Sequence, residues 1–256
     1  MIPVERQRAI VGLLQERGAV SIQDLSVVLG VSHMTVRRDI QVLEREARVA
    51  SVSGGVTLPA RLAFDQSHAA KTGLMPAQKR AIAKASAALV REGDLVFLDA
   101  GTTTLAIAVE LADRTGLTFV TNDLAIATML SDRSPCQLYL AAGAVDKANL
   151  STEGTMVATF IAKFNIDIAF LSTPAFDLRG ASVPSGAKKV VKQAIVENAT
   201  QTILVTDSSK YGRVAALRAV KLAQLDGIVT DAALPDSAQE SIREQGITLQ
   251  LVQPDS

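Results

Sequence analysis

The residues best suited to binding a ligand form the turn Asp99-Ala100-Gly101-Thr102-Thr103-Thr104. An apolar run at 95–98 leads into this turn and a periodic apolar segment at 105–111 leads out of it, which predicts a strand, a tight turn and a helix. Backbone N–H groups and hydroxyls would then gather at the positive end of the helix, where they suit a phosphate or a carboxylate. Asp99 could accept hydrogen bonds from ligand hydroxyls. On these residues alone, an ordinary turn with a threonine cap is the alternative.

Polar residues follow several other apolar runs in the second part of the chain. From residue 77 onward, short apolar runs alternate with helical patterns, which is typical of a mainly parallel sheet covered by helices on both faces. We expect its strands at 95–98, 117–120, 137–141, 168–171, 202–205, 227–230 and 248–251. Ligands of such sheets lie outside the carboxyl ends of the strands. The sequence therefore predicts a binding crevice with contacts from Asp99, Gly101, Thr102, Thr103, Thr104, Asn122, Gly143, Asp207 and Lys210.

Lys210 is the most suggestive of these residues, because a lysine after a strand can meet a phosphate or a sugar oxygen. A surface lysine on a turn is the alternative, and for each of the other positions a plain turn or helix cap is the alternative. Several polar strand ends together favour a shared crevice over unrelated turns.

The N-terminal part of the chain predicts a compact helical module. Helices are expected at 4–17, 22–29 and 33–46, followed by a hairpin at 48–57. Ser21 and Asp24 form a capping box for the second helix, and Ser32 can cap the third. Val36, Ile40 and Leu43 form one buried stripe on the third helix, at i, i+4 and i+7.

The polar residues early in the third helix lie away from that stripe. A helix-turn-helix uses its second helix in this way, with the apolar side packed and the early polar residues in the major groove of DNA. Arginine can read guanine or hold phosphates, and threonine can contact a thymine methyl group. With the hairpin as a wing, the expected DNA contacts are Ser32, His33, Thr35, Arg37, Arg38 and Arg48.

The charge of this module is modest, with eight arginines, no lysine and six acidic residues in 1–61. An ordinary helical module with solvated arginines would carry a similar charge. The order of caps, glycine turn and arginine pair is therefore what favours DNA binding.

The length and composition of the chain indicate how many domains it forms and where a DNA-binding surface can lie. A chain of 256 residues, 48% of them hydrophobic, is long enough for two domains with substantial cores. The segment 59–76 lacks periodicity and holds Pro59, Gly73 and Pro76, so we place a linker there. The expected domains are a winged helix-turn-helix over 1–58, the linker over 59–76, and an effector-binding and oligomerisation domain over 77–256. The formal net charge is zero, so a DNA-binding surface must be local.

The number and spacing of cysteines and histidines limit the disulfide and metal chemistry that this chain can support. The single cysteine, Cys136, cannot form an intrachain disulfide, which fits a reducing cytoplasm. Two histidines and one cysteine lack metal-ligand spacing, so we expect no metal and no cofactor. We find no apolar run of membrane-spanning length and expect a cytoplasmic protein with no membrane partner.

Together these motifs resemble the DeoR family of bacterial transcriptional regulators over nearly the whole chain. In the N-terminal part the resemblance rests on Glu5-Arg6-Gln7, Leu25-Ser26, the run 31–40, Leu43-Glu44 and Gly54-Gly55. In the C-terminal part it rests on the segments 79–83, 93–94, 98–104, 120–122, 151–154, 167–170 and 207–212. The resemblance implies a winged helix-turn-helix joined to an α/β sensor domain similar to ribose-5-phosphate isomerase. It also implies a homo-oligomer, double-stranded operator DNA as partner and a phosphorylated sugar or related effector.

The chain departs from the family pattern at positions that concern the ligand. Ala142 stands where the family commonly has a glycine, and Ser172-Thr173-Pro174 replaces a glycine-rich acidic motif. Lys188 and Val190 stand in place of two acids, whereas Lys192 matches the family lysine. Acids suit neutral sugar hydroxyls, but a cation suits a second negative group. We therefore add Lys188 to the expected contacts and predict an effector more anionic than a simple sugar phosphate, such as a phosphorylated sugar acid.

The sequence thus predicts a DNA-binding regulator, a repressor of a carbohydrate or sugar-acid catabolic operon, that responds to such an effector. One competing hypothesis is a sugar-phosphate isomerase-like enzyme with an N-terminal helical appendage, which would need a carboxylate base such as Asp99, Asp123 or Asp207. Another is a purely structural oligomer. Turnover of ribose 5-phosphate would support the enzyme, and specific operator binding would exclude the scaffold.

Overall fold

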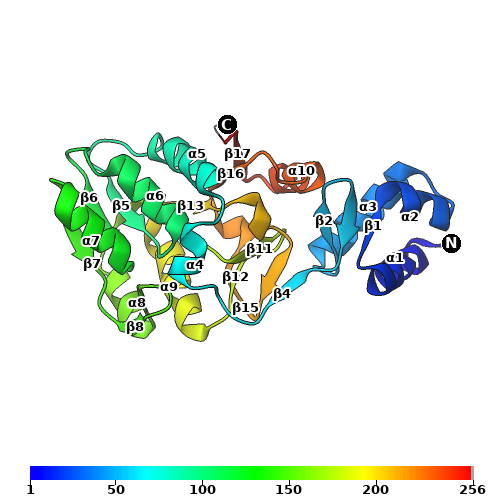
Figure 1. Cartoon of the computed structure of the whole chain (residues 1–256), viewed down its shortest axis with the longest axis horizontal. Coiled ribbons are helices and arrows are strands. Elements are labelled where there is room, and N and C mark those ends of the chain that lie inside the picture. Colours follow the sequence, from blue (N-terminus) through cyan, green and yellow to red (C-terminus); the bar gives the residue numbers. More distant parts are fainter. Residues whose placement is uncertain (255–256) are drawn as a thin grey trace.

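The computed structural model describes residues 1–254 as an elongated molecule with a small domain at one end (Figure 1). The small domain contains the helices α1 (Pro3–Arg17), α2 (Ile22–Leu29) and α3 (His33–Arg45). Beside them lies an antiparallel sheet in the order β1 (Ala19–Ser21), β3 (Gly55–Thr57) and β2 (Ala50–Val52). The predicted winged helix-turn-helix is therefore confirmed. The sequence did not indicate β1, because a three-residue strand is too short to show a periodic pattern.

Caps and apolar spacing explain the small domain. Val36, Ile40 and Leu43 are buried as predicted and belong to one core with apolar residues of α1, α2 and the sheet. Ser21 and Ser32 cap α2 and α3, each accepting a hydrogen bond from the backbone N–H three positions further on. The helix boundaries thus follow from local residue types.

The larger domain is built on a seven-stranded sheet in which all neighbouring strands run parallel. The strand order is β17 (Thr248–Val252), β16 (Gly227–Asp231), β13 (Ala199–Val205), β10 (Ile166–Leu171), β5 (Leu95–Leu98), β6 (Thr118–Thr121) and β7 (Gln137–Leu140). All seven strands were predicted. From β5 the chain adds β6 and β7 on one side, and from β10 it adds β13, β16 and β17 on the other. The topological switch point, where ligands of such sheets bind, therefore lies between β5 and β10.

Alternating apolar residues let helices cover both faces of this sheet. In β5, Phe97 belongs to the core on one face, whereas Val96 and Leu98 belong to the core on the other. The face of Val96 is covered by α5 (Pro76–Ala87), α6 (Thr102–Leu111) and α7 (Leu124–Arg133). The face of Phe97 is covered by α8 (Thr155–Ile161), α9 (Gly186–Asn198) and α10 (Asp236–Glu244).

Short elements complete the domain. A second antiparallel sheet contains β11 (Ala175–Asp177), β12 (Gly180–Val183) and β15 (Leu217–Lys221), and a hairpin contains β8 (Ala144–Asp146) and β9 (Ser151–Glu153). Two 3-10 turns, η1 (Ser208–Lys210) and η2 (Leu222–Gln224), follow β13 and β15. None of these was expected, because they lie outside the alternation of apolar runs and helical patterns that identified the parallel sheet.

The segment 59–76, where the sequence indicated a linker without periodicity, contains two short regular elements. Its strand β4 (Ala60–Leu62) pairs in parallel with β14 (Arg213–Ala215), and it also forms the helix α4 (His68–Thr72). Residues 60–66, here called the strap, run over the larger domain before α4. The physical reason is backbone pairing with a distant strand, which local composition does not reveal.

The small domain contacts the larger one directly. The hydroxyl of Tyr211, just after η1, hydrogen-bonds Glu44 in α3. Arg45 in α3 forms an ion pair with Glu244 in α10, at 3.0 Å between exposed side chains. The recognition helix therefore touches the larger domain through two neighbouring residues near its C-terminal end.

Candidate effector site and DNA-binding surface

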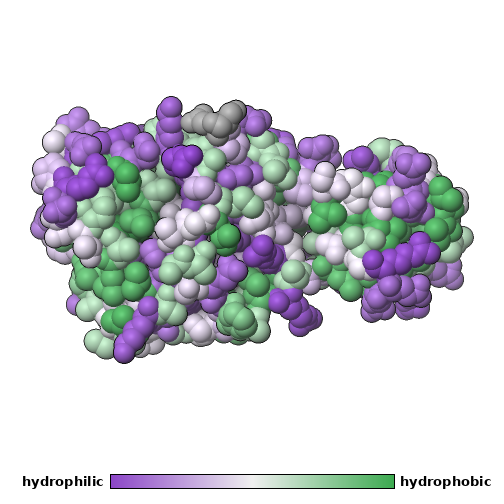
Figure 2. Space-filling model, in the orientation of Figure 1, coloured by the Kyte–Doolittle hydropathy of each residue, from purple (hydrophilic) through white to green (hydrophobic). Residues whose placement is uncertain are grey.

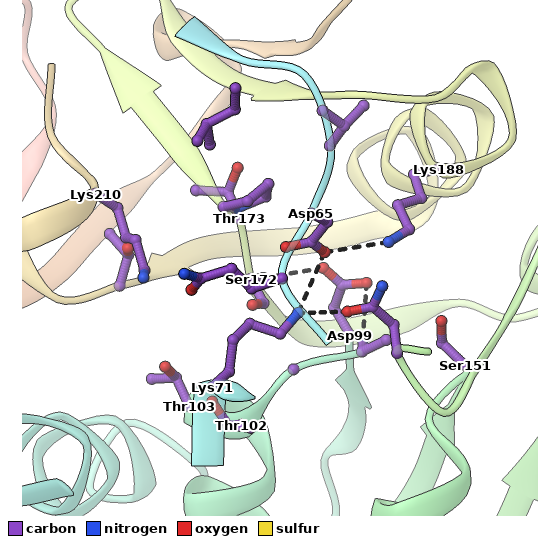
Figure 3. A pocket seen from close by; sticks show the side chains of 18 of the residues that line it. Asp65, Lys71, Asp99, Thr102, Thr103, Ser151, Ser172, Thr173, Lys188 and Lys210 are labelled. Atoms are coloured by element: carbon purple, nitrogen blue, oxygen red, sulfur yellow. Dashed lines mark hydrogen bonds and ion pairs between the residues drawn. The ribbon is translucent and has the colours of Figure 1, made fainter. Parts of the chain in front are cut away.

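A cavity of about 360 Å³ lies at the switch point of the sheet (Figure 3). Its walls come from the turns after β5, β6, β10 and β13, from α9 and from the strap. Seven cationic side chains and four carboxyl groups line it: Arg61, Lys71, Lys79, Lys188, Lys192, Lys210 and Arg213 against Asp65, Asp99, Glu153 and Asp207. This surplus of positive charge favours an anionic ligand.

Asp99 fixes the floor of the cavity. Its carboxylate accepts hydrogen bonds from the backbone N–H groups of Ala100 and Ser172, both at 2.9 Å. The Nζ atom of Lys192 lies 2.5 Å from its Oδ2 atom, and only 2% of Asp99 is exposed. The expectation that Asp99 accepts bonds from ligand hydroxyls is therefore corrected, because both oxygens already join the β5 turn to the β10 turn and α9.

The first turn of α6 presents backbone donors to the cavity. Gly101 precedes this helix, and a side chain there would collide with the side chain of Ser172. Thr102 and Thr103 line the cavity, and within residues 1–254 their backbone N–H groups have no acceptor. Unpaired N–H groups at a helix N-terminus suit a phosphate or carboxylate oxygen.

Two lysines of the cavity carry charge with no nearby counterion. Within the described residues, no carboxylate oxygen lies within 4.0 Å of Lys79 or Lys210. Burial lowers the pKa of Lys79, and this effect outweighs the opposing attraction of Asp207. An anionic ligand would supply the missing charge partner for both side chains.

A second cationic cluster contains two lysines bridged by one carboxylate. Oδ2 of Asp65 lies 3.2 Å from Nζ of Lys71 and 3.1 Å from Nζ of Lys188 (Figure 3). Oδ2 of Asp146 also lies 3.1 Å from Nζ of Lys188. Burial lowers the pKa of Lys188, but Asp65 and Asp146 outweigh it, so the pKa is raised. Burial also lowers the pKa of Lys71, and there the effect of Asp65 is too small to reverse it.

This cluster gives Lys188 counterions that the sequence did not reveal. The side chain does line the cavity, as predicted, and is 16% exposed. Two carboxylates already pair with it, so an anionic group of a ligand would have to take the place of one of them. They arrive from the strap and from β8, segments that are distant in sequence.

Two other expected contacts do not line the cavity. Thr104 is fully buried, and its hydroxyl donates to the carbonyl of Gly101 at 2.7 Å. Gly143 packs under α8, where a Cβ atom would lie 2.5 Å from Cγ2 of Val157. Both predictions are corrected, because one residue fixes the turn and the other allows a close helix contact.

Asn122 and Asp207 lie in the cavity wall, but their polar groups are engaged. Asn122 accepts from the N–H of Ala100 at 3.1 Å and donates to the carbonyl of Thr152 at 3.0 Å. Asp207 accepts from the N–H of Ser209 at 3.1 Å and so caps η1, the turn that carries Lys210. Asn122 and Asp207 therefore hold in place the two turns that carry the N–H groups of α6 and the side chain of Lys210.

Several cavity residues were absent from the predicted contacts. Lys79 and Lys192 stand in segments that resembled the family, so the sequence held a signal for them. Asp65 and Lys71 lie in and after the strap, where no periodicity or motif marked them. Their role depends on the pairing of β4 with β14.

The N-terminal half of α3 presents the predicted DNA contacts to solvent. His33, Arg37 and Arg38 are exposed. Thr35 is half-buried and its Oγ1 atom lies 3.0 Å from Oγ of Ser32, so these two hydroxyls fix the start of the helix. An exposed arginine pair above an apolar stripe is the arrangement that a recognition helix needs.

Arg48 lies at the base of the wing. Its guanidinium is 3.6 Å from the carboxylate of Glu46, and both side chains are exposed. Because this ion pair is exposed to water and weak, Arg48 can release the carboxylate of Glu46 and bind a phosphate instead.

A buried ion pair orients α3. Arg6 of α1 contacts Asp39 of α3 at 2.7 Å, and Gln7 donates to the same carboxylate at 3.3 Å. Asp39 and Arg37 are two positions apart, so the pair turns the arginine side of α3 away from α1. The sequence motif at Arg6 and Gln7 thus acts by positioning the helix.

The described residues lack two features that would suggest other functions. No helix in 1–254 is long and apolar enough to cross a membrane. No group of three histidine, cysteine, aspartate or glutamate side chains in that range is arranged to hold a metal ion.

Comparison with known proteins identifies the family. Residues 6–61 match the DeoR-like helix-turn-helix domain and residues 75–232 match the DeoR C terminal sensor domain. The chain belongs to the DeoR family of transcriptional regulators. The HTH-type transcriptional regulator YgbI of Escherichia coli strain K12 is 46% identical over 97% of this chain and 98% of its own length. The glycerol-3-phosphate regulon repressor of the same strain is 30% identical over 98% of this chain and 100% of its own.

The chain also resembles a solved structure at much lower sequence identity. Ribose 5-phosphate isomerase A from Methanocaldococcus jannaschii is 18% identical, with a TM-score of 0.38 over 52% of this chain and 53% of that one. A likeness at this level gives no ground for an isomerase activity. This DeoR-family chain is a DNA-binding regulator and not an enzyme, as predicted.

Proposed function

We propose that this regulator represses an operon for the breakdown of a carbohydrate or sugar acid, and that a phosphorylated sugar or phosphorylated sugar acid in the cavity controls it. The observation that carries this proposal is the convergence of Lys79, Lys210 and the free N–H groups of α6 on one cavity. A phosphate group satisfies such donors together. The name of the glycerol-3-phosphate regulon repressor, a relative over its full length, supports a phosphorylated effector.

On the DNA side, α3 enters the major groove of a double-stranded operator. Arg37 and Arg38 contact bases or phosphates, His33 and Thr35 set the register of the helix, and Ser32 caps it. Arg48 at the wing contacts the phosphate backbone. Such a protein acts in the cytoplasm, where the operator and the metabolite are both present.

The effector controls the operator through the relative arrangement of the two domains or of two subunits. It can change DNA affinity only to the extent that it binds two arrangements with different affinity. The cavity lies beside η1, and η1 leads directly into the contact with α3. This adjacency supports a coupling through the domain contact.

Pairs of operator half-sites require at least a dimer. Exposed apolar side chains gather near the edge strand β7 and the β8–β9 hairpin, namely Leu140, Val145, Leu150 and Met156. Figure 2 shows apolar surface at the end of the molecule that carries α8 and β8. We infer that a second copy of the chain covers this face. Met156→Glu should yield smaller particles in sedimentation, and an unchanged particle size would contradict the assignment.

Calorimetric titration of sugar phosphates and of the matching dephosphorylated sugars tests the phosphate site. Lys210→Gln should weaken binding of the phosphorylated compounds by about tenfold to a hundredfold, since a hydrogen bond to a charged group is worth about 1.5–3 kcal/mol. Lys163→Gln, on an exposed residue outside the cavity, is the matched control. Equal affinity for phosphorylated and dephosphorylated compounds would refute the proposal.

A further inference from the structure

The cavity has two separate cationic regions. Lys210 lies on one side of the view in Figure 3, and Lys188 lies on the other, above Asp65 and Lys71. In the first region, no carboxylate oxygen of the described residues lies within 4.0 Å of Lys210. In the second region Asp65 bridges two lysines, at 3.2 Å from Lys71 and 3.1 Å from Lys188.

The two carboxylates of the second region are held differently. Asp146 also accepts bonds from the backbone N–H groups of Ala148 and Asn149, at 3.0 and 3.2 Å, so its own loop fixes it. Within residues 1–254, the carboxylate of Asp65 has no hydrogen-bond partner except the two lysines. Asp65 is therefore the carboxylate that can leave the cluster without breaking other bonds of its side chain.

The chain around Asp65 has little to anchor it in the cavity. Its neighbour Phe64 is 76% exposed, so the strap is not held there by an apolar side chain. The ordered pairing of the strap lies further back, in β4. Between β4 and the bond from the N–H of His68 to the carbonyl of Ala148, at 2.8 Å, this part of the strap is held over the cavity by the ion pair of Asp65 with the lysines.

We propose that Asp65 occupies the site of an effector carboxylate, and that a phosphorylated sugar acid places its own carboxylate between Lys71 and Lys188 and displaces Asp65 with the strap. This inference rests on the proposed function, because the phosphate of the same ligand occupies the Lys210 region. After this exchange the cluster still contains two carboxylates, that of the ligand and that of Asp146, beside Lys71 and Lys188. A ligand carboxylate added beside Asp65 would instead leave an unbalanced buried charge, which is costly.

A sugar phosphate without an acid group behaves differently. It has no anion to exchange at Lys188, so Asp65 stays in place and the strap stays closed. The site therefore distinguishes an aldonic acid phosphate from its aldose phosphate by the position of the strap as well as by affinity.

Displacement of the strap would move a segment that is joined to the DNA-binding domain and packs beside it. The strap is the covalent connection between the wing strand β3 and α4. Its first residue, Ala60, donates its N–H to the carbonyl of Gly212, at 3.1 Å. A Cβ atom at Gly212 would lie 2.6 Å from Cβ of Ala50 in the wing, so the strap, β14 and the wing meet at this point.

The test uses full-length protein and three matched pairs of probes: erythrose 4-phosphate with 4-phosphoerythronate, ribose 5-phosphate with 5-phosphoribonate, and glucose 6-phosphate with 6-phosphogluconate. Calorimetry gives the affinities, and hydrogen exchange reports on the amides of residues 60–66. We expect the acid of the best-fitting pair to bind more tightly than its aldose and to accelerate exchange in the strap. The aldose phosphate should leave this exchange unchanged or slow it.

Two variants sharpen the result. Asp65→Asn removes the internal anion, so it should raise the affinity for the acid by about tenfold and change that for the aldose less than about twofold. Lys188→Gln should abolish the preference for the acid. Asp113→Asn, which removes one charge from an exposed pair with Arg133, is the matched control and should change neither affinity.

Several outcomes would overturn the inference. These are tight binding of the acid without faster exchange in the strap, or an acid-to-aldose affinity ratio that Asp65→Asn leaves unchanged. Binding of aldose phosphates alone would refute the inference and leave the proposed function standing, whereas failure of every phosphorylated probe would refute both. Should Asp65→Asn fail to fold, exchange in the unaltered protein decides the question.

Discussion

The hydroxyl of Tyr211 lies 3.2 Å from Oε1 of Glu44. Tyr211 directly follows Lys210, at the end of the η1 turn that borders the cavity, and Glu44 is buried near the end of the recognition helix α3. The same Oε1 atom accepts the N–H of Ser51 in β2 at 2.6 Å. One carboxylate therefore joins the effector site to both DNA-binding elements of the small domain.

Removal of this contact should uncouple the two sites. In Tyr211→Phe we expect effector affinity to change less than about twofold, because the ring stays and only the hydroxyl is lost, and stability to fall by about 1 kcal/mol. The response of operator affinity to effector should shrink, as measured by fluorescence anisotropy with and without effector. Tyr139→Phe is the matched control, since the Tyr139 hydroxyl bonds only Gln137 on β7 among the described residues. A full effector response in Tyr211→Phe would remove the contact from the coupling.

Glu44 should also make stability depend on pH. Burial raises the pKa of Glu44, although bonds from Ser51 and Tyr211 lower it in part. Between its ordinary value of 4.5 and this raised value, the folded state binds more protons than the unfolded state, so stability falls as pH rises. Each unit by which the pKa is raised corresponds to about 1.4 kcal/mol lost above that range.

The variant Glu44→Gln isolates this effect, because the amide oxygen can still accept from Ser51 and Tyr211. Urea unfolding of both proteins should show the stability of the wild type falling relative to the variant from pH 4.5 to neutral pH. Parallel profiles over this range would show that the carboxyl of Glu44 is not buried in solution.

The pair of Lys192 and Asp99 should make a large contribution to stability. Their side chains are 7% and 3% exposed, and breaking a buried pair by removing one partner typically costs about 3–5 kcal/mol. We expect Lys192→Met to lower the free energy of unfolding by that amount in urea titrations. The double variant Asp99→Asn with Lys192→Met should recover part of the loss, because no unpaired charge is then buried. A loss below about 1 kcal/mol in the single variant, which is typical of exposed pairs, would contradict the burial of this pair.

Arg38 should contribute to operator recognition. Arg38→Ala is expected to cost about 1–3 kcal/mol of operator binding if the arginine reads a base, and to relax the preference at that base. Arg91→Ala, on an exposed loop of the sensor domain, should leave binding unchanged. Loss of affinity in equal measure for operator and random DNA would instead assign Arg38 to a phosphate.

The long elements of this fold were accessible from sequence. The stripe of Val36, Ile40 and Leu43 and the seven apolar strands each repeat a local pattern often enough to be recognised. Strands such as β1 and β4 have three residues each, and their existence depends on partners far along the chain. Sequence reasoning therefore found the sheet and the recognition helix but missed the short strand β4 within the linker segment.

The residues of the candidate site also fall into two groups, those that a local pattern predicted and those whose role depends on distant partners. The Gly101 turn and Lys210 were predicted because their local residue types are typical of phosphate-binding turns, and both line the cavity. The ion pair of Asp65 with Lys188 joins residues 123 positions apart, so no local pattern could show that this lysine is already neutralised. Thr104 was misassigned because side-chain direction on a helix separates it from Thr103, one position away.

The most direct test of the central claim is the affinity of the pure protein for its own upstream intergenic DNA. Fluorescence anisotropy would be recorded at several salt concentrations, with and without the phosphorylated sugars and sugar acids named above and their dephosphorylated forms. We predict sequence-preferring binding that weakens with salt and changes by about tenfold or more with one phosphorylated compound, but not with its dephosphorylated form. Binding without sequence preference at every salt concentration, or binding that no phosphorylated compound alters, would contradict the claim that this protein couples operator DNA to a phosphorylated effector.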